Sequence, residues 1–346
     1  MAQKCIFCGK TPNGATPETK KTKEHVIPQW LSKYLGRYNS VCHLPCITDY
    51  EITFSKLTFP ACKACNDADS KLEGEAKAVV EKLMDSKSVT GQEISTLMDW
   101  FDKLRVGLWL GQLTLQKKLD LMDPNFYIND RIGTKDRMLI IERVQGLGDG
   151  LGLVGTDTNM FLLAPCVFQV WFNDVLITNA STDGLVSGKL GFPKMSKVQS
   201  TGYRGATATV SRGMNRTVSP VLPGIDGTNK TVLYQPMFKQ YIPNQFYDTP
   251  YVHQHCYDYD TGMGGIFVQK NSNAIQYMKP GDKITLMPKL QSKDNTLDSM
   301  KRVYKLQNHV VLKLNDINSD TKEMSTWIKA SEVQNRVIID RLENAK

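Results

Sequence analysis

The spacing of apolar positions in the first third of the chain is typical of helices. One helical repeat runs through residues 66–84, and a second starts near Thr90 and extends to about Leu119. Thr90 and Glu93 stand in the order Ser/Thr-x-x-Glu of a capping box, which marks the start of a helix. The apolar positions of the first repeat are Leu72, Ala76, Val79, Val80 and Leu83. We therefore expect two consecutive helices, the second of which connects an N-terminal module to the rest of the chain.

From Arg137 onward the apolar runs become short and are separated by Gly, Asn, Asp and Pro, as in strands joined by turns. The predicted strands are 138–144, 160–163, 167–177, 207–210, 232–234, 265–269, 283–287 and 303–314. A final helix is predicted at 330–344. Its apolar side consists of Val333, Val337, Ile338 and Leu342. That side either docks onto its own domain or forms a homodimer, and the sequence leaves both open.

The length of 346 residues allows two or three domains. No run of 18 apolar residues is present, and the N-terminus lacks the apolar segment of a signal peptide, so we expect a cytoplasmic protein without membrane contact. In that compartment the eight cysteines are better explained as metal ligands or free thiols than as disulfides.

The net charge of +8 favours a polyanionic partner and is unevenly distributed. Residues 1–40 hold seven Lys or Arg against two Glu, and residues 187–245 hold eight against Asp226. Aromatic residues are interleaved with the second basic segment, an arrangement that suits phosphates and stacked bases. A solvated basic face explains the segment equally well.

Two CxxC pairs, separated by 53 residues, provide four thiolates for a closed structural zinc site. The ligands are Cys5, Cys8, Cys62 and Cys65. The second pair opens the helix at 66–84, as in a treble clef. The run Cys42-His43-Leu44-Pro45-Cys46 offers substitute ligands or a second site, whereas Cys166 and Cys256 lack a partner pattern and are expected to be core thiols.

Between the two pairs stands Lys23-Glu24-His25-Val26-Ile27-Pro28, which suggests a strand that ends at a turn. The ordered set CxxC, EHVIP and CxxCN resembles the zinc-knuckle branch of the HNH (ββα-metal) endonucleases. The resemblance covers residues 4–85, about a quarter of the chain. It implies a ββα-metal module with a structural zinc.

The resemblance also implies roles for individual residues. His25 occupies the position of the general base, which a neutral imidazole suits near pH 7. Glu24 occupies the position of a ligand to a catalytic Mg²⁺ or Mn²⁺, and Asn66, directly after the last cysteine, that of a second ligand. Glu73, Ser70 or Asp69 could complete the cation site from the same helix.

Two features depart from the family pattern. The final motif histidine is missing from residues 66–73, and the middle asparagine is not evident, so that Ser55, Thr58 or Asn39 would have to replace it. Elsewhere, His253-Gln254-His255 could place two imidazoles on one side of a strand as a second metal site, although a solvated or partly packed strand explains them better.

The sequence thus predicts an α+β protein with an HNH module at 1–85, a helical connector at 86–136 and a β-rich domain at 137–346. The expected activity is cleavage of double-stranded DNA. Candidate phosphate contacts are Lys23, Arg204, Arg212 and Arg216. The missing motif residues leave two alternatives: a zinc-dependent nucleic-acid-binding module without catalysis, and a nuclease gated by its C-terminal domain.

Overall fold

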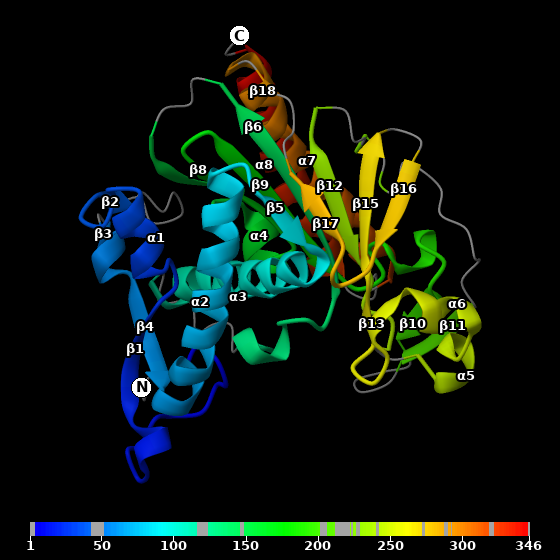
Figure 1. Cartoon of the computed structure of the whole chain (residues 1–346), viewed down its shortest axis with the longest axis horizontal. Coiled ribbons are helices and arrows are strands. Elements are labelled where there is room, and N and C mark those ends of the chain that lie inside the picture. Colours follow the sequence, from blue (N-terminus) through cyan, green and yellow to red (C-terminus); the bar gives the residue numbers. More distant parts are fainter. Residues whose placement is uncertain are drawn as a thin grey trace.

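The computed structural model describes most of the chain. The described residues are 4–42, 52–115, 124–145, 149–200, 206–211, 222, 224–225, 229–239, 242–271, 274–286, 290–291, 293–317 and 322–344. Helices and strands are both abundant, which confirms the mixed α+β class (Figure 1). Within these ranges no helix has the length and apolarity that a membrane crossing requires.

Four helices are long, and the others are short. The α-helices are α1 (Gln29–Tyr34), α2 (Lys63–Met84), α3 (Gly91–Leu115), α4 (Asn159–Leu163), α5 (Asn244–Tyr247), α6 (Pro250–His255), α7 (Lys293–Ile317) and α8 (Lys322–Asn344). The 3-10 helices are η1 (Pro17–Thr19), η2 (Phe54–Lys56), η4 (Ile128–Asp130) and η5 (Ser187–Lys189).

The central element is an eight-stranded sheet in the order β16-β15-β12-β6-β9-β8-β7, with β18 parallel to the end of β6 and all other neighbours antiparallel. Its strands are β6 (Asp136–Val144), β7 (Leu151–Val154), β8 (Val167–Phe172), β9 (Val175–Thr182), β12 (Thr231–Gln235), β15 (Ile266–Asn271), β16 (Ala274–Met278) and β18 (Leu290–Gln291).

The remaining strands form two-stranded pairs outside the central sheet. They are β1 (Lys21–His25) with β4 (Thr58–Cys62), β2 (Val41–Cys42) with β3 (Ile52–Thr53), β5 (Ser88–Thr90) with β17 (Lys283–Thr285), β10 (Lys194–Ser200) with β11 (Ala206–Ser211), and β13 (Cys256–Asp258) with β14 (Met263–Gly264).

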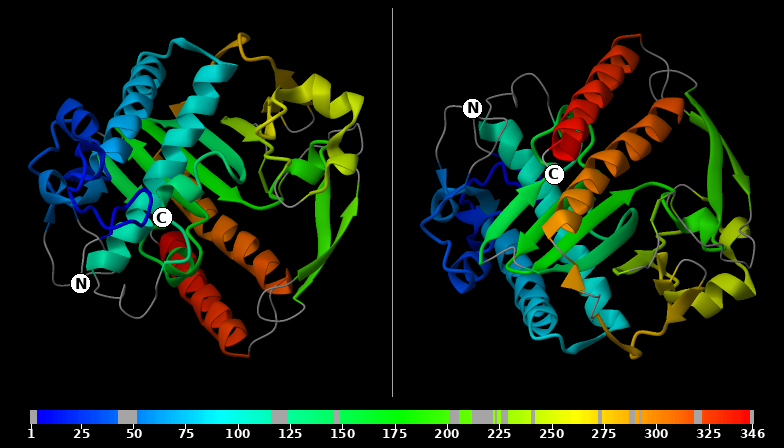
Figure 2. Two further views of the ribbon diagram at one scale, coloured as in Figure 1. Left: turned by 90° about the horizontal axis from the view of Figure 1, so that it is seen from below. Right: turned by 90° about the horizontal axis from the view of Figure 1, so that it is seen from above.

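The sheet separates two hydrophobic cores because its side chains alternate between its faces. In β6, Leu139 and Ile141 belong to the core that includes α3 and the N-terminal segment, whereas Met138 and Ile140 belong to the core under α7 and α8. Figure 2 shows α3 on one face of the sheet and α7 with α8 on the other. The first core is continuous from Cys5 to the sheet, with α3 between them.

Both helices predicted from the first third of the chain are present. The capping box of α3 forms as expected: the Thr90 hydroxyl accepts from the Glu93 backbone N–H at 3.2 Å, and the Glu93 carboxylate accepts from the Thr90 N–H at 2.8 Å. The terminal helix is also present as α8, but it packs through Ile328, Ser331 and Asn335 and leaves Val333 exposed.

Two predicted strands are wrong. Segment 303–314 lies in α7, where buried Ser299, Val303, Leu306 and Val310 recur every three to four residues; that helical period outweighs the β-branched composition. Segment 160–163 lies in α4, which begins because the Thr158 hydroxyl caps it by accepting from the Phe161 N–H.

The other predicted strands are present with small changes. Segment 167–177 is a hairpin rather than one strand: β8 and β9 meet at a tight turn in which Asn173 adopts a positive φ of 53°. The predicted strands 138–144, 207–210, 232–234, 265–269 and 283–287 correspond to β6, β11, β12, β15 and β17.

Charged side chains of α3 lie in the interior between the N-terminal segment and the sheet. Asp102 accepts from the Arg105 guanidinium at 2.8 Å and from Arg137 of β6 at 3.1 Å. Arg137 also pairs with Asp99, and Arg105 donates to Asn179 of β9. Each of these buried charges therefore has an ionic partner, as burial requires.

We predict that Asp102→Ala destabilises the protein by about 3–5 kcal/mol, because it leaves Arg105 and Arg137 buried with fewer partners. Chemical denaturation measures the change. The matched control is Asp67→Ala, which breaks the exposed pair with Lys63 and should cost less than about 1 kcal/mol. Equal effects of the two substitutions would contradict a structural role for the Asp102 network.

Candidate metal centre and histidine site

The candidate site is built from β1, β4 and the N-terminal half of α2. β1 and β4 pair antiparallel in a register that sets His25 opposite Thr58 and Glu24 opposite Phe59. Cys62 ends β4 and is the N-cap of α2, which begins at Lys63. One strand pair therefore joins the two motifs: Cys62 lies opposite Lys21 at one end of the pair, and His25 lies opposite Thr58 at the other end.

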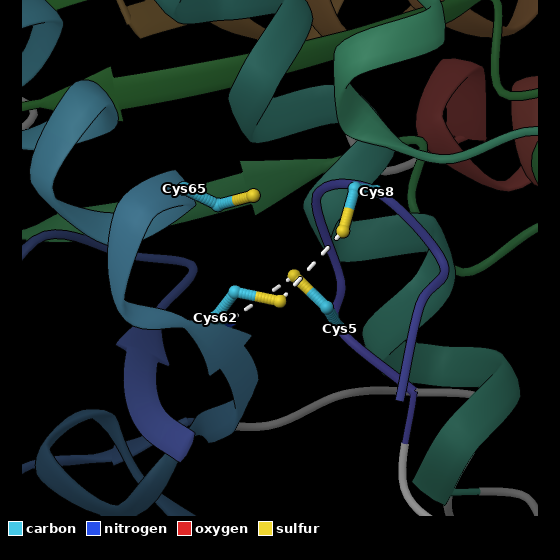
Figure 3. Close-up of side chains that lie close together, drawn as sticks. All are labelled: Cys5, Cys8, Cys62 and Cys65. Carbon is cyan, nitrogen blue, oxygen red and sulfur yellow. Dashed lines mark hydrogen bonds between the residues drawn. The ribbon is translucent and has the colours of Figure 1, made fainter. Parts of the chain in front are cut away.

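All four predicted zinc ligands come together. The ligand atoms of Cys5, Cys8, Cys62 and Cys65 lie within 4.8 Å of one another. Figure 3 shows their sulfur atoms pointing into a common space between the first knuckle and the start of α2. The Sγ atoms of Cys8 and Cys62 are 3.8 Å apart. This arrangement confirms a four-cysteine cluster that could bind a metal ion, and four thiolates suit zinc.

Backbone groups shape the first knuckle. The Gly9 N–H donates to the Cys5 carbonyl, and Gly9 has a φ of 70° with the Tyr127 ring against its α-carbon, so a side chain there would be both strained and blocked. Burial raises the pKa of the Cys5 thiol, but backbone N–H groups, first that of Cys62, outweigh burial and leave the pKa lowered. Burial and the neighbouring Cys5 raise the pKa of Cys62 to about 12.

The remaining cysteines lie apart from this cluster where the structure describes them. Cys166 is buried, and burial raises its pKa to about 12, consistent with the expected core thiol. Cys256 is half-buried. In the run from Cys42 to Cys46, only the backbone of Cys42 is described, so this alternative ligand set lies outside the described residues.

His25 ends β1 and is half-buried. Its Nε2 atom lies 3.3 Å from the Ser55 carbonyl oxygen and 3.1 Å from the Gln29 amide nitrogen. Among the three candidates to replace the middle motif asparagine, Ser55 reaches His25, and it does so through its backbone carbonyl. Burial is the main reason that the pKa of His25 lies below its ordinary value. The imidazole is therefore neutral near pH 7.

Glu24 is buried on the inner side of β1, where it meets a cation that the sequence analysis did not anticipate. The Lys103 ammonium of α3 lies 2.7 Å from Glu24 Oε1 and 2.8 Å from Asp69 Oδ2, and it also pairs with Glu73. We call Glu24, Asp69 and Glu73 the carboxylate cluster. Burial raises the pKa of Glu24 to about 7, whereas the three carboxylates raise the pKa of Lys103 against the effect of burial.

No family model, no curated protein and no solved structure matches this chain.

The structure arranges the candidate cation ligands differently from the roles that the resemblance implies. Asn66 donates from Nδ2 to the Thr22 hydroxyl at 3.3 Å and to the Lys23 carbonyl at 3.5 Å, so it ties α2 to β1. Ser70 donates to the Asp67 carbonyl. Asp69 and Glu73, one helical turn apart, are the α2 residues that join Glu24.

The carboxylate cluster fits a divalent cation by donor chemistry, but not together with Lys103. Three carboxylates within 4.8 Å of one another are hard oxygen ligands of the kind that Mg²⁺ and Mn²⁺ prefer. The ammonium already lies among them, and two cations in one buried space would repel each other strongly. As folded, the cluster therefore holds Lys103 and does not fit the expected metal ion.

Several other candidates lie elsewhere. Lys23 is exposed on β1 near His25, whereas Arg204, Arg212 and Arg216 lie outside the described residues.

His253 and His255 belong to helix α6, not to a strand, because Thr249 caps that helix. Their rings stack on Tyr259 and Tyr251 respectively, so the suggested second metal site does not form.

We predict about one tightly bound zinc ion per chain, measurable by elemental analysis. Cys65→Ser should remove the zinc and unfold the β1–β4–α2 unit, because metal binding and folding are coupled in small sites. Cys256→Ser, outside the cluster, should retain the zinc. Folded wild-type protein without zinc would rule out a zinc-filled cluster.

Proposed function

We propose that residues 4–84 form a nuclease module that hydrolyses phosphodiester bonds of DNA, with His25 as the general base. The observation that carries the proposal is the setting of His25: a neutral, half-buried imidazole at the end of β1, with Nε2 facing the Ser55 carbonyl. The cysteine cluster at the other end of the β1–β4 pair and the succession of two paired strands and a helix support the same assignment.

The chemistry follows from the hydrogen bonds of the ring. In the tautomer with hydrogen on Nε2, that atom donates to the Ser55 carbonyl, and the lone pair is on Nδ1, which the Gln29 amide nitrogen approaches at 3.4 Å. When water replaces the Gln29 amide at Nδ1, that atom accepts a proton from the water as the water oxygen attacks phosphorus. The bond from phosphorus to the 3′ oxygen breaks, and the leaving oxygen takes a proton from solvent. Ser55 is a positioning residue in this scheme because it fixes the ring through Nε2.

Basic side chains near His25 would bind the phosphates on either side of the cleaved bond. Lys23 and Lys33 are exposed, and their positive charges help to lower the pKa of His25, which places them within electrostatic range of the ring. A double-stranded substrate suits such contacts, because they neutralise backbone phosphates without reading a base.

We predict that His25→Ala lowers the cleavage rate about 10²–10⁴-fold, the usual cost of losing a general base. A plasmid-nicking assay with Mg²⁺ or Mn²⁺ measures the rate, while zinc content and DNA affinity should be nearly unchanged. His253→Ala, a histidine outside the module, is the matched control and should cut at the wild-type rate. Wild-type cleavage by His25→Ala would remove His25 from the mechanism.

Lys103 favours a second candidate function, a zinc-stabilised DNA-binding module without cleavage. The ammonium fills the carboxylate cluster that would otherwise hold the catalytic cation. In this alternative His25 and Ser55 are structural, and the basic surface near β1 provides the function. The two candidates differ in the nicking assay and agree in DNA binding.

We predict for both candidates that the double variant Lys23→Gln, Lys33→Gln binds DNA more weakly. The slope of its log affinity against log salt concentration should be smaller by the amount that corresponds to about two phosphate contacts. Fluorescence anisotropy at several salt concentrations measures both quantities. The matched control is the double variant Lys77→Gln, Lys87→Gln. It removes the same charge from the C-terminal half of α2 and from the residues that follow this helix. An unchanged salt slope in the first variant would remove this face from the DNA interface.

A further inference from the structure

The side chain of Lys103 ends at the point where carboxylates from two elements converge. Glu24 comes from β1, Asp69 and Glu73 come from α2, and all three pair with the ammonium. We propose that Lys103 is an internal cation that occupies a divalent-metal site and excludes the metal while α3 keeps its present position. The inference deepens the proposed function, since it concerns the cation of that same site.

The charge and donor count of the carboxylate cluster point to a divalent ion as the alternative occupant. Three carboxylates around one ammonium leave two negative charges without compensation within the cluster when all are ionised. Asp69 is 7% exposed, and its Oδ1 atom has no hydrogen-bond partner among the described residues. A buried carboxylate oxygen of this kind is available to a metal once the ammonium is removed.

Lys103 cannot leave the cluster through a side-chain movement alone. It is 1% exposed, and it lies on a helix that is held from both sides. On the sheet side, Asp102 of α3 pairs with Arg137. On the module side, an added Cβ at Gly107 would meet Val26 at 3.1 Å, which shows how closely α3 fits against the residue that follows the β1 strand.

Withdrawal of the ammonium therefore requires α3 to shift against β1 and α2. The same shift would disturb the ion pairs between α3 and the central sheet, because Asp99 and Asp102 share Arg137 as a partner. The occupant of the carboxylate cluster is thus coupled to the position of the sheet. A metal-bound state would be reached only when the contacts on both sides of α3 rearrange together.

The test measures Mn²⁺ binding to full-length, zinc-loaded protein by electron paramagnetic resonance of the free ion. Wild type should show no Mn²⁺ binding that depends on Glu73. Lys103→Met should bind one Mn²⁺ at this site with an affinity at least on the order of 100-fold higher than that of wild type, because the substitution removes a positive charge a few ångström from the metal. Adding Glu73→Gln to Lys103→Met should abolish the gain. The control, Lys82→Met, removes a half-exposed lysine paired with Glu93 and should bind like wild type.

Lys103→Met leaves three carboxylates without their ammonium partner, so the thermal unfolding of this variant is recorded with and without Mn²⁺. A rise in Tm with Mn²⁺ that Glu73→Gln removes supports the proposal. If the variant folds in neither condition, the wild-type titration decides, since tight Mn²⁺ binding by wild type that Glu73→Gln abolishes would overturn the proposal. Equal Mn²⁺ affinity of folded Lys103→Met and wild type would also overturn it.

A parallel nicking assay separates this inference from the proposed function. Gain of Mn²⁺ binding by Lys103→Met with no cleavage by either protein would leave the inference intact and reject the nuclease. Cleavage by wild type, together with Mn²⁺ binding by wild type that requires Glu73, would support the nuclease and reject the inference about Lys103.

Discussion

The need to pair every buried charge on α3 governs the architecture of this protein. The helix runs between the cysteine-containing segment and the central sheet, and its interior positions include Asp102, Lys103 and Arg105. Burial makes each of these charges costly unless an opposite charge lies in contact. Arg137 of the sheet and Glu24 of β1 meet this need from opposite sides. The position of α3 is therefore fixed by ion pairs as well as by apolar packing.

Local periodicity predicted much of the fold, and it failed where composition was given more weight than spacing. The helix α2 and the capping box of α3 could be read directly, because their signals lie within one or two turns. The strand expected at 303–314 was inferred from β-branched residues, although the buried positions recur at a helical interval. The short helix α4 has no room for a period, so only its cap at Thr158 could have indicated it.

The candidate site was predictable as far as contiguous motifs extend. The four cysteines and the motif at Glu24 and His25 lie within short segments of the sequence, and the structure brings the cysteines together. Lys103 was missed because it comes from α3, far along the chain, and its role depends on tertiary packing. One signal was present: Asp102, Lys103 and Arg105 are charged residues between apolar positions of one helix, and charged residues that are buried in this way require ionic partners. The Ser55 carbonyl could not be identified, since any residue type provides that group.

The N-terminal segment and the central sheet both pack against α3, and this limits how the protein can evolve by recombination. A segment that ends after α2 carries all the motif residues, but it leaves behind the lysine that pairs with Glu24, Asp69 and Glu73. It also leaves behind the wall of α3 on which Phe59 rests, where Gly111 is too close to the ring to accept a side chain. Transfer of the motif segment alone into another gene would therefore give an unbalanced acidic interior, and productive exchange must include α3 with a surface that can hold it.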